Sequence, residues 1–316
     1  MDQNSNAIMT LCSHLCVGEG VIPLEPKEWG DFAKLLMQNQ VKPEELFGFS
    51  VDDLMGKIGL DRQMAERIVR LIDRNASLSF ELSEYENMGI SAITRADQKY
   101  PAKLKKKLGN NCPPIFYYAG NLDLLNRSVV GYVGSRTVGE EDVRFTKETV
   151  VKTFTNGYGV VSGGAKGIDT VSEETILGLG GIAIEYLSDS MLRKMRKSET
   201  VREIQKGNLL LLSVVKPDAG FNVGIAMMRN RYIYAQSVGT VVVRSEYNKG
   251  GTWAGAMEDL KHGWCPELCW NKKTYSGNKA LIQNGAIPID DSWDGNIDTA
   301  VTVQSPSVQQ ISLFDM

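Results

Sequence analysis

The sequence has little of what several common functions require. Its 316 residues include only two histidines, His14 and His262, so a Ser–His or Cys–His catalytic arrangement has poor support. Its five cysteines are not spaced as a disulfide framework, which fits a reducing compartment. No apolar run reaches the roughly 18 residues of a membrane span. The N-terminal "MDQNSNAIMT" also lacks the basic-then-apolar plan of a signal peptide. We therefore expect a cytoplasmic protein with no membrane segment.

The common cofactor signatures are missing as well. The segment "GGAKGID" is not the phosphate loop G-x-x-x-x-G-K-[ST], and no G-x-G-x-x-G follows the first predicted parallel strand. Cys12 with Cys16, and Cys265 with Cys269, have a spacing that zinc would tolerate, but "CPELCW" reads as a core strand. We expect no bound cofactor and no metal. Because the formal net charge is −3, binding to nucleic acid would require a local basic patch.

The first half of the chain changes character twice. Residues 1 to about 75 have a helical pattern, with Ser50 and Asp61 as expected N-caps and a turn at Gly59 between two short helices. This pair predicts either a helix-hairpin-helix, whose turn amides grip DNA phosphates, or a small SAM-like interaction module. Residues 76–128 form a connecting region of short strands and a basic helix, interrupted by Pro113 and Pro114.

From residue 129 to about 290 the pattern is regular. Apolar runs begin near 129, 159, 181, 209 and 239 and read as buried parallel strands. Amphipathic stretches lie between and after them, at about 140–156, 168–179, 191–206, 224–237 and 252–262. Alternating strands and helices predict an α/β fold with a doubly wound, mostly parallel sheet, preceded by the small helical domain. Ligands bind to such sheets at the carboxyl ends of the strands.

Residues 291–316 are rich in Asp, Ser, Thr, Gln and Pro and predict a flexible tail. The tail ends in "QISLF", which resembles the short peptide that docks bacterial replication proteins on the sliding clamp. Gln310 would supply the polar anchor, and Leu313 and Phe314 would enter an apolar groove. The alternative is a tail that packs back on the domain.

Four segments that are basic or rich in glycine fall where the predicted strands end. They are "VGSRTVG" (133–139), "VVSGGAKGIDT" (160–170), "MMRNRYIY" (227–234) and "SEYNKGGTWAGA" (245–256). Backbone amides at helix N-termini, together with basic side chains, make a cradle for anions. We therefore expect one anion-binding site built from these segments at one edge of the sheet.

The order and spacing of these motifs, with "SGNKALIQNGA" and the lead-in "GISAITRADQKYPAKLKK", resemble the DprA/Smf (DNA-processing protein A) family over roughly residues 80–290. The resemblance implies a Rossmann-like domain that binds single-stranded DNA, protects it and delivers it to the RecA recombinase, usually as a homodimer. The DNA-binding residues that it implies are Gly134, Ser135, Arg136, Ser162, Gly163, Gly164, Lys166, Asn230 and Arg231, with Lys249, Gly250, Gly251 and Thr252 as a less close match. Gly163 and Gly164 would open backbone amides to a phosphate.

The chain departs from the family pattern in two places. Glu173 stands where many members have a histidine, and the winged-helix domain with which many members end is not expected here. Glu173 is interpreted as a solvent-facing residue, or alternatively as a group for a sugar hydroxyl or for catalysis. The second reading connects to phosphoribohydrolases of the same broad superfamily, with Asp169 and Glu246 as further carboxylates. A DNA-binding mediator without chemistry of its own is the main hypothesis, and a nucleotide-derivative enzyme or sensor is the alternative.

Two further features have two readings each. The segment 191–206 predicts a basic helix that either tracks the DNA backbone or is a solvated surface helix. Tyr232, Tyr234 and Trp253 lie near the basic segments and would stack on bases, but their apolar neighbours favour a partly buried position.

Overall fold

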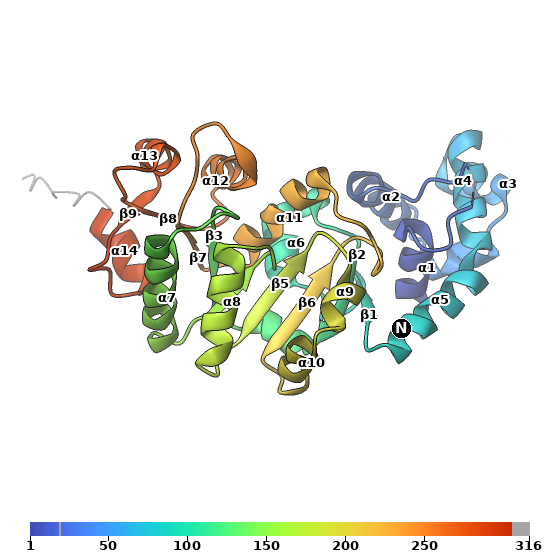
Figure 1. Ribbon diagram of the computed structural model, residues 1–316. Coiled ribbons are helices and arrows are strands. Elements are labelled where there is room, and N and C mark those ends of the chain that lie inside the picture. The colour runs from blue at the N-terminus through green and yellow to red at the C-terminus, as the bar shows by residue number, and fades with distance from the viewer. Residues whose placement is uncertain (19, 305–316) are drawn as a thin grey trace, which may run out of the picture.

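A nine-stranded sheet forms the centre of the protein, in a computed structural model that describes residues 1–18 and 20–304 (Figure 1). Its strand order is β1-β2-β6-β5-β4-β3-β7-β8-β9. The strands are β1 (Ser91–Thr94), β2 (Ile115–Gly120), β3 (Val129–Val133), β4 (Gly159–Ser162), β5 (Ala183–Leu187), β6 (Leu209–Ser213), β7 (Gly239–Val242), β8 (Glu267–Trp270) and β9 (Ile287–Ile289). Strands β3 to β9 pair in parallel, and β1 and β2 extend the sheet antiparallel beyond β6.

The apolar runs become strands because both faces of the sheet are covered by helices. One face packs against α7 (Glu140–Thr155), α8 (Ile168–Gly178), α9 (Met191–Met195) and α10 (Ser198–Gln205). The other packs against α6 (Ala102–Leu108), α11 (Val223–Gln236), α12 (Gly250–His262) and α13 (Ser276–Gln283). Along β3, Val130 and Tyr132 enter the first core and Val129 and Val133 the second, as strand alternation requires. The predicted doubly wound α/β fold is confirmed.

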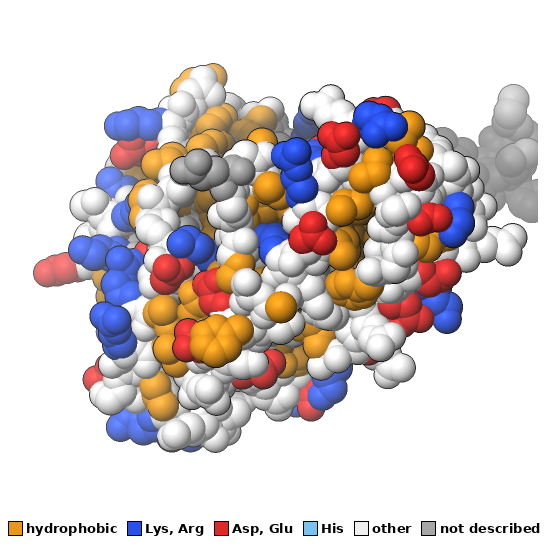
Figure 2. All heavy atoms as spheres, turned by 90° about the vertical axis from the view of Figure 1, so that its right-hand side faces the viewer, with side chains coloured by type: hydrophobic (Ala, Val, Ile, Leu, Met, Phe, Trp, Pro, Cys, Tyr) orange, Lys and Arg blue, Asp and Glu red, His pale blue; other side chains and the backbone are white. Residues whose placement is uncertain are grey.

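The N-terminal helices pack against the β1–β2 end of the sheet (Figure 1). They are α1 (Gln3–Cys12), α2 (Pro26–Gln38), η1 (Pro43–Gly48), α3 (Val51–Asp53), η2 (Leu54–Ile58), α4 (Arg62–Asp73) and α5 (Asn75–Asn87). Ser50 and Asp61 are N-caps as predicted, and Gly59 makes the turn with a φ of 82°. The Ser13 hydroxyl lies 2.7 Å from that of Tyr117 on β2. Figure 2 shows the outward surface of this end, where hydrophobic and charged side chains alternate.

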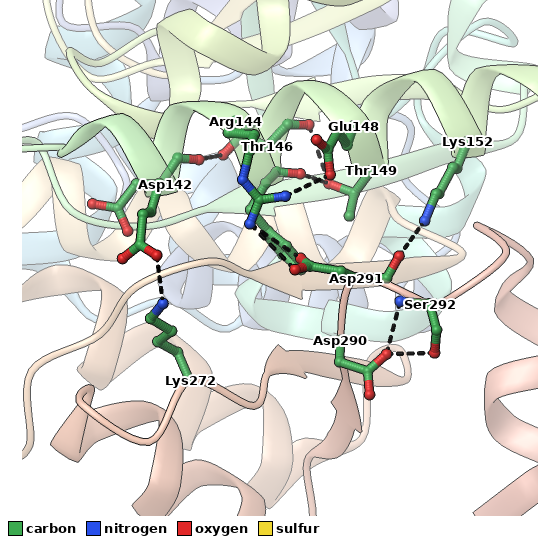
Figure 3. Close-up of polar contacts among 12 residues, drawn as sticks. Asp142, Arg144, Thr146, Glu148, Thr149, Lys152, Lys272, Asp290, Asp291 and Ser292 are labelled. Carbon is green, nitrogen blue, oxygen red and sulfur yellow. Dashed lines mark hydrogen bonds and ion pairs between the residues drawn. The ribbon is translucent and has the colours of Figure 1, made fainter.

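The expectation of a flexible tail from residue 291 is wrong for residues 291–304. Helix α14 (Ile297–Gln304) packs beside β9, with Ile297 buried against Gly239 of β7. Figure 3 shows how the preceding segment is held to α7, where Arg144 pairs with Asp291 at 3.2 Å and Lys152 donates to the Asp291 carbonyl. Composition alone suggested disorder because the apolar residues that anchor the segment are few. Gln310, Leu313 and Phe314 lie outside the described residues.

The single basic helix expected over 191–206 is also corrected. The chain forms the short helices α9 and α10, which are separated at Arg196 and Lys197. Ser190 caps the first of them by accepting from the amide of Arg193. Lys194 turns inward, so the segment does not present one continuous basic face.

Candidate functional site: a hollow at the switch point of the sheet

The chain reverses its direction of winding between β3 and β7. From β3 the sheet grows through β4 and β5 to β6, and the chain then crosses back to place β7 on the other side of β3. A crevice forms beyond the carboxyl ends of two strands at such a point. Here it is a hollow of about 620 Å³, lined by residues after β3, after β7 and on the first half of α11. We call it the switch-point hollow.

The switch-point hollow collects most of the predicted DNA-binding residues. Those that line it are Gly134, Ser135, Arg136, Asn230, Lys249, Gly250, Gly251 and Thr252. The remainder lie elsewhere. Ser162 and Gly163 are buried beneath the surface, Gly164 and Lys166 face a second hollow, and Arg231 pairs with Glu258 of α12 at 2.8 Å.

The basic side chains around the switch-point hollow differ in whether they form ion pairs. Arg244 pairs with the buried Asp142 at 3.2 Å, and the exposed Lys249 pairs with Glu246 at 3.1 Å. Arg136 is exposed and, within the part of the chain that the structure describes, forms no ion pair. Its guanidinium instead lies 5.0 Å from the ring centre of Phe221. Arg136 is therefore a cation at the rim that remains available to an anion.

Apolar and aromatic side chains border the same hollow. Phe221 and Met227 are 47% and 44% exposed, and both line the hollow together with Trp253. Tyr247 stands edge-on to Trp253 at 5.1 Å between ring centres. A cation with solvent-exposed rings beside it suits the phosphates and bases of an unpaired strand. Tyr232 and Tyr234, in contrast, are fully buried in the core, as their apolar neighbours indicated.

The loop Gly163–Gly167 holds an anion of its own. The carboxylate of Asp169 accepts from the amide of Gly163 at 3.0 Å and from that of Ala165 at 3.4 Å. Burial raises the pKa of Asp169, while Arg229 at 3.8 Å and these two amides oppose the rise. The amide of Gly164 is directed to the Ser162 hydroxyl at 3.4 Å. The sequence suggested that the amides of Gly163 and Gly164 are open to a phosphate. These bonds show that they are not.

Each glycine of this loop is required for a different steric reason. A Cβ on Gly163 would lie 1.3 Å from Nη1 of Arg229, so only glycine leaves room for that guanidinium. A Cβ on Gly164 would lie 2.6 Å from Oε2 of Glu185. Gly167 has a φ of 84° and its Cβ would lie 2.3 Å from the Ser135 carbonyl. The glycines thus position two buried charged side chains and the loop after β3.

Helix α11 presents Arg229 to the hollow. This residue lies in the segment 227–234 that the sequence singled out, but it was not among the DNA-binding residues that the family resemblance implied. Ala226, Arg229, Asn230 and Ile233 follow the spacing of one helical face, and all four line the hollow. Arg231 is off that face, which explains its pairing with α12 instead. The "RNR" motif was seen in the sequence, and helical periodicity anchored on Ile233 would have selected Arg229 over Arg231.

The N-terminus of α12 closes the opposite wall. Asn230 donates to the carbonyl of Gly251 at 3.0 Å, and the Thr252 hydroxyl donates to the carbonyl of Gly134 at 3.0 Å. These two bonds fix the helix start between α11 and the end of β3. Among the described residues, no side chain caps this N-terminus.

Glu173 lies outside the switch-point hollow. It lines a second hollow of about 640 Å³ between α8 and the α9–α10 segment, which we call the α8 hollow. Lys194 donates to Glu173 at 3.0 Å and to Glu185 at 2.8 Å. Burial and the adjacent Glu185 carboxylate raise the pKa of Glu173 to about 9. Glu173 is thus neither solvent-facing nor beside the proposed phosphate site.

The described residues contain no helix long and apolar enough to cross a bilayer. Across residues 1–18 and 20–304, no three His, Cys, Asp or Glu side chains are grouped in a way that would hold a metal ion.

The fold and the site define a doubly wound, Rossmann-like α/β protein with a basic and aromatic hollow at its switch point. The family model described as DNA recombination-mediator protein A matches residues 91–296, and the chain belongs to this family. DNA processing protein DprA of Streptococcus pneumoniae is 28% identical over 224 residues, which cover 70% of this chain and 76% of that protein. The Bacillus subtilis DprA is 26% identical over 184 residues, with 58% and 61% covered.

Two solved structures share the fold. The X-ray structure of S. pneumoniae DprA superposes with a TM-score of 0.66 and 21% identity, covering 90% of this chain and 99% of that one. DNA processing protein A from Helicobacter pylori gives a TM-score of 0.54 and 23% identity, covering 68% and 96%. The latter protein has been described for its unique mode of binding single-stranded DNA.

Proposed function

We propose that this protein binds single-stranded DNA in the switch-point hollow and acts as a mediator in DNA recombination. The observation that carries the proposal is Arg136 at the rim, which has no ion-pair partner among the described residues and lies beside the exposed ring of Phe221. Phosphates would contact the guanidinium, and bases would stack on the bordering rings. Membership of the recombination-mediator family and the single-stranded-DNA binding of the H. pylori relative support it.

The finer parts of the proposal rest on the family resemblance. The protein would protect the bound strand and promote its loading with RecA, act in the cytoplasm and function as a homodimer. The terminal Gln310, Leu313 and Phe314 would dock on the sliding clamp, which deletion of residues 310–316 should test. Loss of the clamp in a pull-down, with unchanged DNA affinity, is the result expected of that deletion.

No observation favours the alternative of a phosphoribohydrolase-like enzyme. Glycosidic hydrolysis needs two carboxyl groups that flank the scissile bond. In the switch-point hollow, Asp169 accepts from loop amides and Glu246 pairs with Lys249. Glu173 lies in the α8 hollow, where Lys194 holds it. We therefore propose a binding protein rather than this kind of enzyme.

The direct test compares labelled single-stranded and duplex DNA over a salt series. We expect a preference for the single strand and a logarithmic fall in affinity with salt, because counterions are released from the phosphates. Arg136→Ala should weaken binding and reduce the salt slope by about one. Arg127→Ala is the matched control, since Arg127 is exposed just before β3, at the opposite end of that strand.

Equal affinity for duplex and single-stranded DNA would count against the proposal. So would an Arg136→Ala protein that binds as the Arg127→Ala protein does. Folding of both variants is checked by thermal unfolding, where exposed arginines should change the free energy of unfolding by less than about 0.5 kcal/mol.

A further inference from the structure

The floor of the switch-point hollow is a buried cation whose Nε has no hydrogen-bond partner among the described residues. Arg229 is 4% exposed and lines the hollow. Among the described residues its Nε has no hydrogen-bond partner, and the one carboxylate within 4.0 Å is that of Asp169, 3.8 Å from Nη1, with Glu185 and Asp189 farther away. Burial lowers the pKa of Arg229, but a guanidinium stays charged in proteins. A buried N–H group without an acceptor costs free energy, and a bound acceptor would remove that cost.

The first turn of α12 faces the same space. Gly250, Gly251 and Thr252 all line the hollow, and α12 is 13 residues long. The first amides of a helix have no partner within the helix. Within the described residues, the amides of these three residues meet no other acceptor. They carry the positive end of the helix dipole, which attracts anions.

Both groups are held rigidly, so the site exists before a ligand arrives. Asn230 follows Arg229 on α11 and ties the Gly251 carbonyl, and Gly163 supplies the space that the guanidinium occupies. Asp169 is itself satisfied by the amides of Gly163 and Ala165, so it anchors Arg229 without using up its donors. Arg244 and Lys249 are engaged by Asp142 and Glu246.

The size of the hollow limits what can reach its floor. A volume of about 620 Å³ is that of a site for one small ligand, which typically measures about 300–1,000 Å³. An internal phosphodiester at Arg229 would need a nucleotide on each side inside this space, whereas a terminal phosphate needs only one behind it. A phosphomonoester also carries a charge near −2 and three acceptor oxygens.

We propose that Arg229 and the N-terminus of α12 form a subsite for a phosphomonoester, such as the phosphorylated end of a DNA strand or a free nucleotide. The inference rests on the proposed function, because it assigns the end of the bound strand to the floor of the same hollow. The rest of the strand would leave past Arg136 and Phe221 at the rim.

The test uses oligothymidylates of one length that differ only at their ends, with dTMP as a free competitor. A 5′-phosphate, a 3′-phosphate and a hydroxyl-ended strand, each labelled at the other end, are titrated into the full-length protein. We expect one phosphorylated end to bind about tenfold more tightly than the hydroxyl end, the effect of one charge-assisted hydrogen bond. The ratio should fall below about pH 6, where the dianion takes up a proton.

Two variants separate this subsite from strand binding in general. Arg229→Gln should bring the ratio of the affinities for the phosphorylated and the hydroxyl-ended strand close to one. Arg136→Ala should weaken the binding of both strands and keep this ratio. Equal binding of all three strands by the wild-type protein would overturn the subsite but leave the proposed function standing. This comparison needs no variant, so it remains decisive if Arg229→Gln does not fold. Direct binding of dTMP, measured by calorimetry, without binding of any strand would support the subsite and overturn the proposed function.

Discussion

Two hollows of nearly equal volume, about 620 and 640 Å³, lie on either side of the Gly163–Gly167 loop. The switch-point hollow keeps cations without full partners, Arg136 at its rim and Arg229 at its floor. The α8 hollow has more basic side chains, but most of them are neutralised. Arg193 pairs with Asp189, Lys206 with Glu203, and Lys194 with Glu185, and Lys194 also donates to Glu173.

The difference shows that a count of basic residues does not locate a binding site. Whether the basic side chains are paired with acids matters more for binding than their number. An adjacent anion cancels most of the attraction that a cation exerts on a third charge. In the α8 hollow the charges hold α9 to α8 and β5, whereas Arg136 and Arg229 of the switch-point hollow would bind the strand in the function that we propose. We therefore expect substitutions in the α8 hollow to change stability and those in the switch-point hollow to change binding.

Gly167→Ala should have the largest effect because this residue lies in the wall between the two hollows. Its φ of 84° is unfavourable for alanine, and the new Cβ would lie 2.3 Å from the Ser135 carbonyl. Left-handed strain and overpacking each cost about 1–3 kcal/mol, so the free energy of unfolding should fall by about 2–6 kcal/mol. Denaturant unfolding measures this loss.

The same substitution should also weaken DNA binding, since Ser135 and Arg136 would be displaced. Gly178→Ala is the matched control at the other end of α8, where an added Cβ meets nothing within 4 Å. The control should be neutral or slightly stabilising. A Gly167→Ala protein as stable as the control would show that this loop does not fix the wall.

Glu173→Gln tests the α8 hollow through the pH dependence of stability. The pKa of Glu173 is raised from 4.5 to about 9, so the native state keeps a proton that the unfolded chain releases. The free energy of unfolding of the wild type should therefore fall as the pH rises between these values. Glutamine resembles the protonated acid and leaves Lys194 paired with Glu185 alone.

The variant should lose this pH dependence and gain at least about 1 kcal/mol over the wild type near pH 8.5. Glu174→Gln is the control, because Glu174 is the exposed neighbour on α8 and forms no ion pair within the described residues. Parallel stability curves for the wild type and both variants would mean that Glu173 holds no extra proton in the native state.

The sequence predicted the sheet well because buried parallel strands and their intervening helices have strong periodic signals. The runs at β3 to β7 and the helices α7, α8, α11 and α12 lie where the pattern placed them. The edge strand β9 was not predicted, since its three residues "IPI" are too few to show a period. Helix α14 was missed because its polar composition resembled a tail.

The site was only partly predictable, for a physical reason. Gly163, Gly164 and Lys166 appeared to belong with Arg136, because all follow strand ends at one edge of the sheet. Which amides are open depends on the conformation of the loop, and here the nearby Asp169 accepts from those of Gly163 and Ala165. The partners of Glu173 were equally hidden, since Glu185 and Lys194 come from other elements of the fold.

Lys197→Ala should have the smallest effect, and it tests the reading in which the α9–α10 segment tracks DNA. Lys197 is exposed in the α8 hollow and, like Lys166, has no ion-pair partner among the described residues, so it is a cation there that remains available to a phosphate. We expect less than about a twofold loss of single-strand affinity and an unchanged salt slope, because one solvated lysine beside paired charges adds little. Arg136→Ala, measured in the same salt series, should reduce the slope by about one. If Lys197→Ala reduced it equally, the strand would continue from the rim across Lys166 into the α8 hollow, and the division between a binding hollow and a structural one would no longer hold.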